Sequence, residues 1–285
     1  MSLIGTMGSG VSALRTFMKG LEVIGNNIAN VNTTGYKSAQ TRYADSFSNV
    51  LQRSTGGSSV TQIGTGVGLA GITTSFVQGS LATTGSPTDL GISGNGFFRV
   101  KNSADGTEFA TRSGDFRLDS NGYLVTPLGF RVQGLAGAAL TTLGDVKLAT
   151  PPVGTQLRSV AIGRDGKLTE SYSDNTSVTT NQILLQTYTD PTALVKEGGN
   201  LYTGMLAAGP VGALAGSIAL KTDGTNAPRS NGLGSIEAGT LELSNVDLTE
   251  EFANLITTQR SFQAGSRLIT VSDTILEDIV NLKQR

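Results

Sequence analysis

Seven-residue apolar repeats at the two ends of the chain constrain its fold more than any other feature of the sequence. In the N-terminal repeat, apolar residues recur in alternating steps of three and four, as on the face of a helix that packs against a partner. The row is interrupted once, at Gly25, and it includes Val11, Leu14, Met18, Leu21 and Ile28. This pattern predicts an amphipathic helix within residues 1–33.

The C-terminal repeat carries the same alternation from residue 248 to residue 280. One heptad position is apolar five times in succession, at Leu248, Leu255, Phe262, Ile269 and Leu276. The other begins with Phe252 and then weakens to Gln259, Ser266 and Asp273. Polar residues in such a row cost packing but can fix register and partner choice. Asp247 followed by Glu250 is a variant of the capping box and predicts where this helix begins.

Each predicted helix is too slender to be stable alone, because a few buried side chains must offset the entropy of ordering every residue. We therefore expect the two helices to pair. We also expect them to be largely disordered in the free monomer and to fold when neighbouring subunits supply more apolar surface.

Asparagines crowd the end of the N-terminal helix, and their amides favour helix ends because they bond readily to nearby backbone. They are Asn26, Asn27, Asn30 and Asn32. Thr33, Thr34 and Gly35 complete a stop signal. Two interpretations stay open: the amides bond across subunits or back to the turn, or they form a purely local helix stop.

The middle of the chain has a different pattern. Residues 34–75 read as an extended arm or linker, with a run rich in Gly, Ser and Thr at 53–66. Within 76–243, short apolar runs are separated by Asn-Gly and Asp-Gly pairs, which favour hairpins, and no helix-period segment lies between them. The predicted fold class is therefore α+β. The terminal helices, within 1–33 and 244–285, pair as a coiled-coil-like domain, and the centre forms an antiparallel β domain.

Composition excludes most chemistry. The chain contains no Cys and no His, which removes thiol nucleophiles, imidazole bases and zinc sites of the usual ligand types. Its net charge of −1 provides no excess of positive charge for binding nucleic acid. The uncharged spans at 54–88 and 201–220 are broken by Gly, Ser, Thr or Pro, and no basic region precedes the first apolar residues. We expect no enzymatic activity, no cofactor, no metal, no direct membrane insertion and no secretory signal.

Two long motifs resemble the axial family of the bacterial flagellum, its rod and hook proteins. The first is Gly-Asn-Asn-Ile-Ala-Asn-Val-Asn-Thr-Thr-Gly-Tyr-Lys at 25–37. The second is Leu-Ser-Asn-Val-Asp-Leu-Thr-Glu-Glu-Phe at 243–252, which contains Asn245. It is followed by Gln-Arg-Ser-Phe-Gln-Ala at 259–264, which contains Gln259 and Arg260. A weaker likeness occurs at 92–100.

The resemblance implies a structural subunit that self-assembles helically into a hollow tube, most like that of the flagellar hook, which transmits motor torque. The alternative is the distal rod of the basal body, because hook proteins commonly insert an extra outer domain for which this chain has little room. A second alternative is a secreted β-domain adhesin or binding module. The linker at 53–66 is expected either to influence whether the tube is stiff or bends, or to be an inert spacer.

The resemblance also implies partners and a location. The partners are identical subunits in a helical homopolymer, the neighbouring axial proteins (rod, hook cap and hook–filament junction) and the flagellar export apparatus. The expected location is the basal body or hook, outside the cytoplasm, after export without a cleaved signal peptide.

Overall fold

The computed structural model describes residues 3–52, 61–137, 140–149, 154–213, 218 and 220–283. The chain forms two compact units, each built from separated segments. The helical unit comprises Met1–Val31, Ser38–Ser75 and Val246–Arg285, and the β unit comprises Asn32–Lys37 and Phe76–Asn245. Two long helices and a large antiparallel sheet confirm the predicted α+β class.

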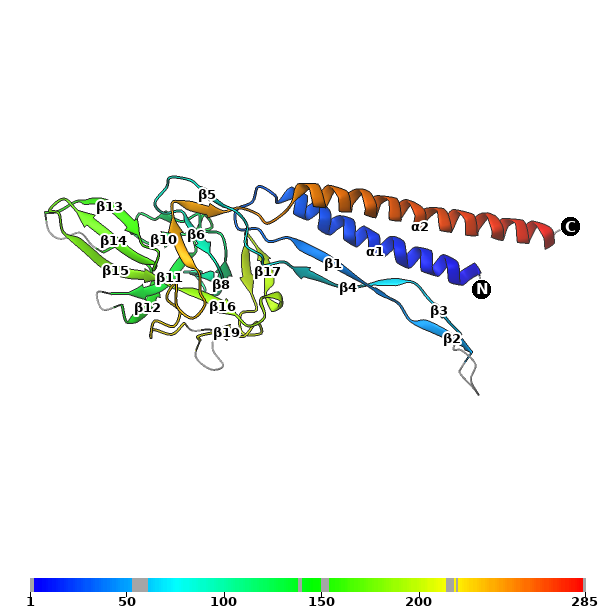
Figure 1. The fold of residues 1–285 in the computed structure, drawn as a ribbon, viewed down its shortest axis with the longest axis horizontal. Helices are drawn as coiled ribbons and strands as arrows, with labels where there is room; N and C mark the ends of the chain where they lie inside the picture. The colour runs from blue at the N-terminus through cyan, green and yellow to red at the C-terminus, as the bar shows by residue number, and fades with distance from the viewer. Residues whose placement is uncertain are drawn as a thin grey trace. The chain divides into compact units, whose positions relative to one another are not determined.

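The helical unit contains α1 (Leu3–Ala29) and α2 (Leu248–Lys283), which lie side by side in Figure 1. The helices are antiparallel, since Asn27 near the end of α1 bonds to Glu251 near the start of α2, whereas Gly10 lies against Ile269. As predicted, Asp247 caps α2: its carboxylate accepts hydrogen bonds from the backbone N–H groups of Thr249 (2.8 Å) and Glu250 (3.3 Å). Within the described residues, neither helix has the length and apolar character needed to cross a bilayer.

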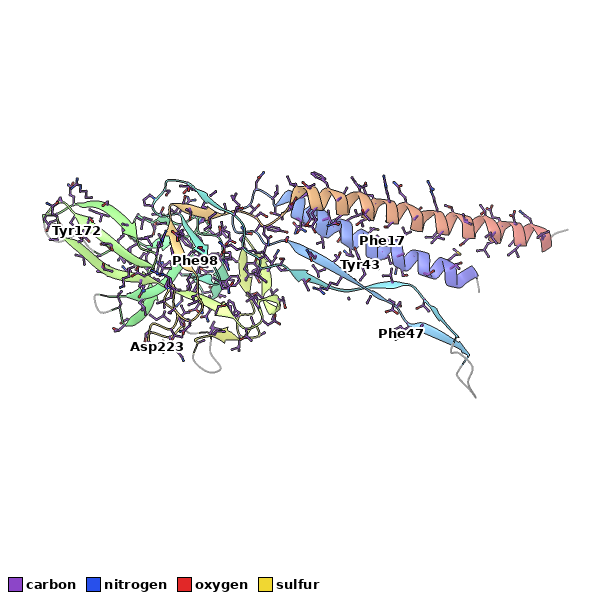
Figure 2. All side chains as sticks on the ribbon, viewed as in Figure 1. Phe17, Tyr43, Phe47, Phe98, Tyr172 and Asp223 are labelled. Atoms are coloured by element: carbon purple, nitrogen blue, oxygen red, sulfur yellow. The ribbon has the colours of Figure 1, made fainter. Side chains whose placement is uncertain are left out.

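A long hairpin completes the helical unit. Its outgoing arm consists of β1 (Ala39–Asp45) and β2 (Ser48–Gln52), and its returning arm consists of β3 (Thr61–Gly64) and β4 (Val67–Thr74). Strand β1 pairs antiparallel with β4, and β2 pairs antiparallel with β3. The hairpin contacts α1, where the rings of Phe17 and Tyr43 pack edge to face with their centroids 6.1 Å apart (Figure 2). Within the segment predicted as an extended arm, 34–75, the structure therefore shows paired strands at 39–45, 48–52, 61–64 and 67–74, whereas residues 34–37 belong to the β unit. Residues 53–60, most of the predicted linker, lie outside the described residues.

The β unit is built on a thirteen-stranded sheet whose observed pairs are all antiparallel in the part of the chain that the structure describes. Its main path runs β13-β14-β15-β11-β7-β8-β18-β17. The strands on this path are β7 (Phe97–Lys101), β8 (Glu108–Thr111), β11 (Arg131–Ala136), β13 (Leu157–Ile162), β14 (Lys167–Tyr172), β15 (Ser177–Ile183), β17 (Val195–Gly198) and β18 (Leu201–Thr203). Paired beside it are β9 (Arg117–Leu118), β10 (Leu124–Val125), β12 (Thr142–Asp145), β16 (Leu185–Tyr188) and β19 (Pro210–Val211).

Three turns in this sheet fall where the sequence places Gly after Asp or Asn. Gly106, Gly122 and Gly166 have φ of +76°, +80° and +77°, a backbone conformation that glycine adopts without strain. They separate β7 from β8, β9 from β10, and β13 from β14. The predicted hairpin turns at these three sites are confirmed.

The core of the β unit is aromatic and aliphatic. Phe98, labelled in Figure 2, is fully buried and meets Phe116 edge to face at 5.1 Å. A second cluster surrounds Phe97 and includes Tyr188, Tyr202 and Met205.

Short strands from both ends of the β unit's sequence pair with each other. Strand β5 (Leu81–Thr83) pairs with β21 (Thr240–Glu242), and β6 (Leu90–Ser93) pairs with β20 (Ser235–Ala238). The first and last strands of this unit therefore lie together, and the segment that follows the hairpin is paired with the segment that leads into α2.

Candidate assembly surface

The contact row of α2 matches the prediction at one heptad position and differs at the other. The predicted residues Leu255, Phe262, Ile269 and Leu276 are half-buried. The second covered row, however, lies one residue earlier than the predicted Phe252, Gln259, Ser266 and Asp273, which are exposed. It consists of the half-buried Thr258 and the buried Glu251, Gly265 and Ser272. Phe252 is 50% exposed, and Leu248, at the first turn, is 39% exposed.

Small residues explain this shift. A Cβ atom at Gly10 would lie 3.2 Å from Cγ1 of Ile269, and one at Gly265 would lie 3.2 Å from Cδ2 of Leu14. Glycine therefore permits the two helix backbones to approach where a larger side chain would hold them apart. The apolar heptad pattern did not reveal this row because its members are small or polar.

The contact face of α1 is also rotated from the predicted one. Leu14, Leu21 and Ile28 are half-buried, but Val11 and Met18 are 38% and 51% exposed. The reason is that α1 has two neighbours in this unit. It packs against α2 on one side and the hairpin on the other, where Thr16 donates a hydrogen bond to the carbonyl of Val67 (3.2 Å). The self-assembly role of all these seam residues stays a prediction.

Helix α2 exposes two groups of large apolar residues on opposite flanks of its contact row. Successive residues turn by about 100° around a helix, which places the first group on one flank and the second on the other. The first group is Leu248, Phe252 and Ile256, and the second is Leu268, Val271, Ile275 and Ile279. An extended apolar surface of this kind marks an interaction site on a soluble protein.

Asn27 joins three elements of the helical unit and is 1% exposed. Its amide N–H donates to the carbonyl of Ala39 (2.8 Å) and to Oε1 of Glu251 (2.8 Å), and its Oδ1 accepts from the backbone N–H of Ala39 (3.0 Å). The side chain thus pairs with the first residue of β1 as a neighbouring strand would. The pKa of Glu251 is raised above its ordinary value, chiefly by burial and also by the negative charge of Glu250. The hydrogen bond from Asn27 opposes this shift.

The other motif residues are dispersed. Asn30 donates to the carbonyl and side chain of Asn26 (both 2.9 Å), a local helix-end contact. Asn32, Gln259 and Arg260 are exposed. Asn245 donates to the carbonyl of Val77 (3.0 Å).

Gly35 occupies a conformation and a space that suit glycine. Its φ is +68°, and a Cβ atom there would lie 2.6 Å from the backbone nitrogen of Ser113. Its own N–H donates to the carbonyl of Glu242 (2.7 Å).

Sequence reasoning missed a buried ion cluster in the β unit. Lys37 donates to Oε1 of Glu242 (2.6 Å), and Arg112 donates to Oε2 of the same residue (3.3 Å). The N–H of Gly79 also donates to Oε1 (2.9 Å). Burial lowers the pKa of Lys37 and of Arg112, and in each case Glu242 opposes that effect. Lys37 is the last residue of the motif at 25–37, and this position in the motif was the one sequence feature that pointed to Lys37.

Family models match three parts of the chain. The model described as "Flagella basal body rod protein" matches residues 7–37, which include most of α1 and Lys37. "Flagellar hook protein FlgE/F/G D1 domain" matches 91–170, and "Flagellar basal body rod FlgEFG protein C-terminal" matches 237–282. The first and third matches contain the two residues of the Lys37–Glu242 ion pair.

Relatives align over the whole chain or over half of it. The flagellar basal-body rod protein FlgG of Bacillus subtilis is 36% identical and covers 99% of this chain and 100% of its own length. The protein of the same name from Borreliella burgdorferi is 30% identical and covers 100% of both chains. The flagellar hook protein FlgE of the same organism is 38% identical but covers 51% of this chain and 36% of its own length.

Proposed function

This chain belongs to the flagellar rod and hook family of axial structural proteins, which are not enzymes, and we propose that it is a subunit of the distal rod of the basal body. In that role, copies of the chain assemble helically into a hollow, straight drive shaft. The terminal helices pair in a coiled-coil-like manner and carry assembly, and the β unit forms the outer wall.

The observation that carries the rod proposal is the alignment of rod relatives from end to end. The hook relative from Borreliella burgdorferi leaves 64% of its own length unmatched, as expected if hook proteins contain additional outer sequence. This supports the rod, which was the alternative drawn from the sequence, over the hook. The hook remains the second candidate because two hook relatives reach 38% and 44% identity in the regions that do align.

The exposed apolar flanks of α2 support assembly into an open filament and not into a closed oligomer. Two different surfaces on opposite sides of one helix can contact two different neighbours, which is the arrangement of a heterologous interface. Such contacts repeat and produce a filament instead of a closed dimer. The adhesin alternative has no corresponding use for these two surfaces.

Electron microscopy of the purified full-length chain tests the proposal. We expect straight tubes at high protein concentration. Curved, supercoiled tubes would favour the hook, and a protein that stays monomeric would contradict both. In the native bacterium, deletion of the gene should leave basal bodies without a complete rod, and the protein should fractionate with the flagellum. We further propose that neighbouring axial proteins and the flagellar export apparatus are its partners.

A further inference from the structure

A shallow groove of about 590 Å³ lies along the exposed side of α1, beside the start of β4. Met7, Val11 and Val67 provide its apolar lining, and Arg15 lies on the same helix face because it follows Val11 by four residues. All of these residues belong to the helical unit.

Arg15 is available for a partner. Helix α1 has only one other cation, Lys19, and that side chain pairs with Glu22 at 2.7 Å. Arg15 forms no ion pair within the residues that the structure describes, and it is exposed. The groove is therefore apolar with one unpaired positive charge on its helix face.

The C-terminal half of α2 has the complementary character. Val271, Ile275 and Ile279 are exposed on one face, and Asp278 lies at its edge, seven residues after Val271. Asp278 also forms no ion pair among the described residues. The C-terminal half of α2, residues 266–283, carries three carboxylates, at Asp273, Glu277 and Asp278, against two cations, Arg267 and Lys283.

This part of α2 also extends past its partner helix. Gly10 of α1 lies against Ile269 of α2. From this contact α2 continues to Lys283, whereas α1 reaches back only to Leu3. The last turns of α2 therefore have no described α1 residue opposite them, and Leu282 is 74% exposed.

We propose that the C-terminal half of α2 in one copy docks in the α1–β4 groove of the next copy, with Asp278 facing Arg15. This inference rests on the proposed function and specifies which surfaces meet. Opposite charges set the register of the contact, and the apolar side chains supply its buried area.

Charge reversal in the full-length chain tests the pairing by sedimentation of polymer. Arg15→Glu and Asp278→Arg should each raise the critical concentration for assembly about tenfold or more, since two like charges then face each other. The double variant should return the critical concentration to within about threefold of the parent, because the pair is restored in reverse. Arg158→Glu, an exposed residue of β13 with no described ion pair, is the matched control and should change nothing.

Single variants that assemble as the parent does, or a double variant no better than the singles, would overturn the pairing. A parent chain that never polymerises would instead remove the proposed function itself. Crosslinking provides a measurement that does not depend on charge. Because the chain has no native Cys, Arg15→Cys combined with Asp278→Cys should give a ladder of covalent oligomers with a short bismaleimide. Arg15→Cys with Arg158→Cys should not, and a missing ladder in the first pair counts against the contact.

Discussion

Nζ of Lys37 lies 2.6 Å from Oε1 of Glu242, and neither side chain is exposed to solvent. The two residues are 205 positions apart, so the ion pair holds the start of the β unit to its end. Lys37→Met would leave the buried carboxylate of Glu242 with the N–H of Gly79 and the longer contact to Arg112 as its partners. Breaking a buried ion pair in this way costs about 3–5 kcal/mol. We expect a matching loss in the free energy of unfolding, measured by urea denaturation of the full chain.

An exposed pair provides the control for that measurement. Lys19 and Glu22 are separated by a similar distance, 2.7 Å, but both side chains are 58% exposed. Lys19→Met should therefore cost less than about 1 kcal/mol. Equal losses in the two variants would contradict the importance of burial.

Gly35→Ala should destabilise the β unit through steric overlap as well as backbone strain. Gly85 separates the two effects, because its φ of +78° is similar but nothing lies within 4 Å of a Cβ placed there. We expect Gly85→Ala to cost about 1–3 kcal/mol from strain alone and Gly35→Ala to cost more. Thermal unfolding of both variants checks the order, and equal melting temperatures would show that the overlap with Ser113 is relieved without cost.

Asn27→Ala should loosen the junction between α1, β1 and α2. It removes hydrogen bonds to both backbone groups of Ala39 and to Glu251, and each buried group left without a partner costs about 1–3 kcal/mol. Hydrogen exchange of the Ala39 amide should accelerate in the variant. Asn30→Ala removes the hydrogen bonds from the Asn30 side chain to Asn26 and should leave the Ala39 amide unchanged. If Asn27→Ala and Asn30→Ala together still gave polymers of normal length, these amides would have no role in assembly.

Gly10→Val should separate the two helices, because a Cβ atom at residue 10 already lies within 3.2 Å of Ile269. Overpacking of this kind costs about 1–3 kcal/mol. Gly8 lies on the same helix with nothing within 4 Å of its Cβ position, so Gly8→Val has no such penalty. Circular dichroism on heating should show earlier loss of helix in the first variant alone.

Glu251→Gln should stabilise the helical unit at neutral pH and have little effect in acid. The folded state raises the pKa of Glu251 above its ordinary value of 4.5, so it binds the proton more tightly than the unfolded chain does. Stability from this group is present below pH 4.5 and is lost as pH rises through the folded pKa. The amide of Gln keeps an oxygen for Asn27 but never becomes charged. Unfolding at about pH 4 and about pH 7 should show the gain only at the higher pH, and the same gain at both would refute this account.

Local signals predicted the local features of the fold. Asp247 marked the start of α2, and glycines after Asp or Asn marked three turns of the sheet, because each of these residues acts on backbone within a few positions of itself. Leu255, Phe262 and Ile269, which the heptad rule placed on the contact face of α2, are half-buried, since a packed helix covers one apolar face. These features depend on nearest neighbours along the chain, so the sequence displays them directly.

Features that depend on distant segments were not predictable in the same way. Val11 and Met18 were assigned to a seam because the heptad pattern assumes one partner, whereas α1 has two. Gly10 and Gly265 carry no apolar signal, although they lie in the contact between the two helices. Lys37, Arg112 and Glu242 are residue types that are almost never fully buried unless paired, and nothing near any of them in the sequence identifies its partners.

The pairing of β5 with β21 and of β6 with β20 has a consequence for the order of events during synthesis. A chain released residue by residue from the ribosome cannot close its β unit until residue 242 has emerged, since the last strand, β21, ends there. Contacts between such remote segments form slowly, because the entropy of closing a long loop is lost before the contacts contribute any stabilisation. The β unit therefore stays incomplete until most of the chain has been translated, because the pairs that join its two ends are the last that can form.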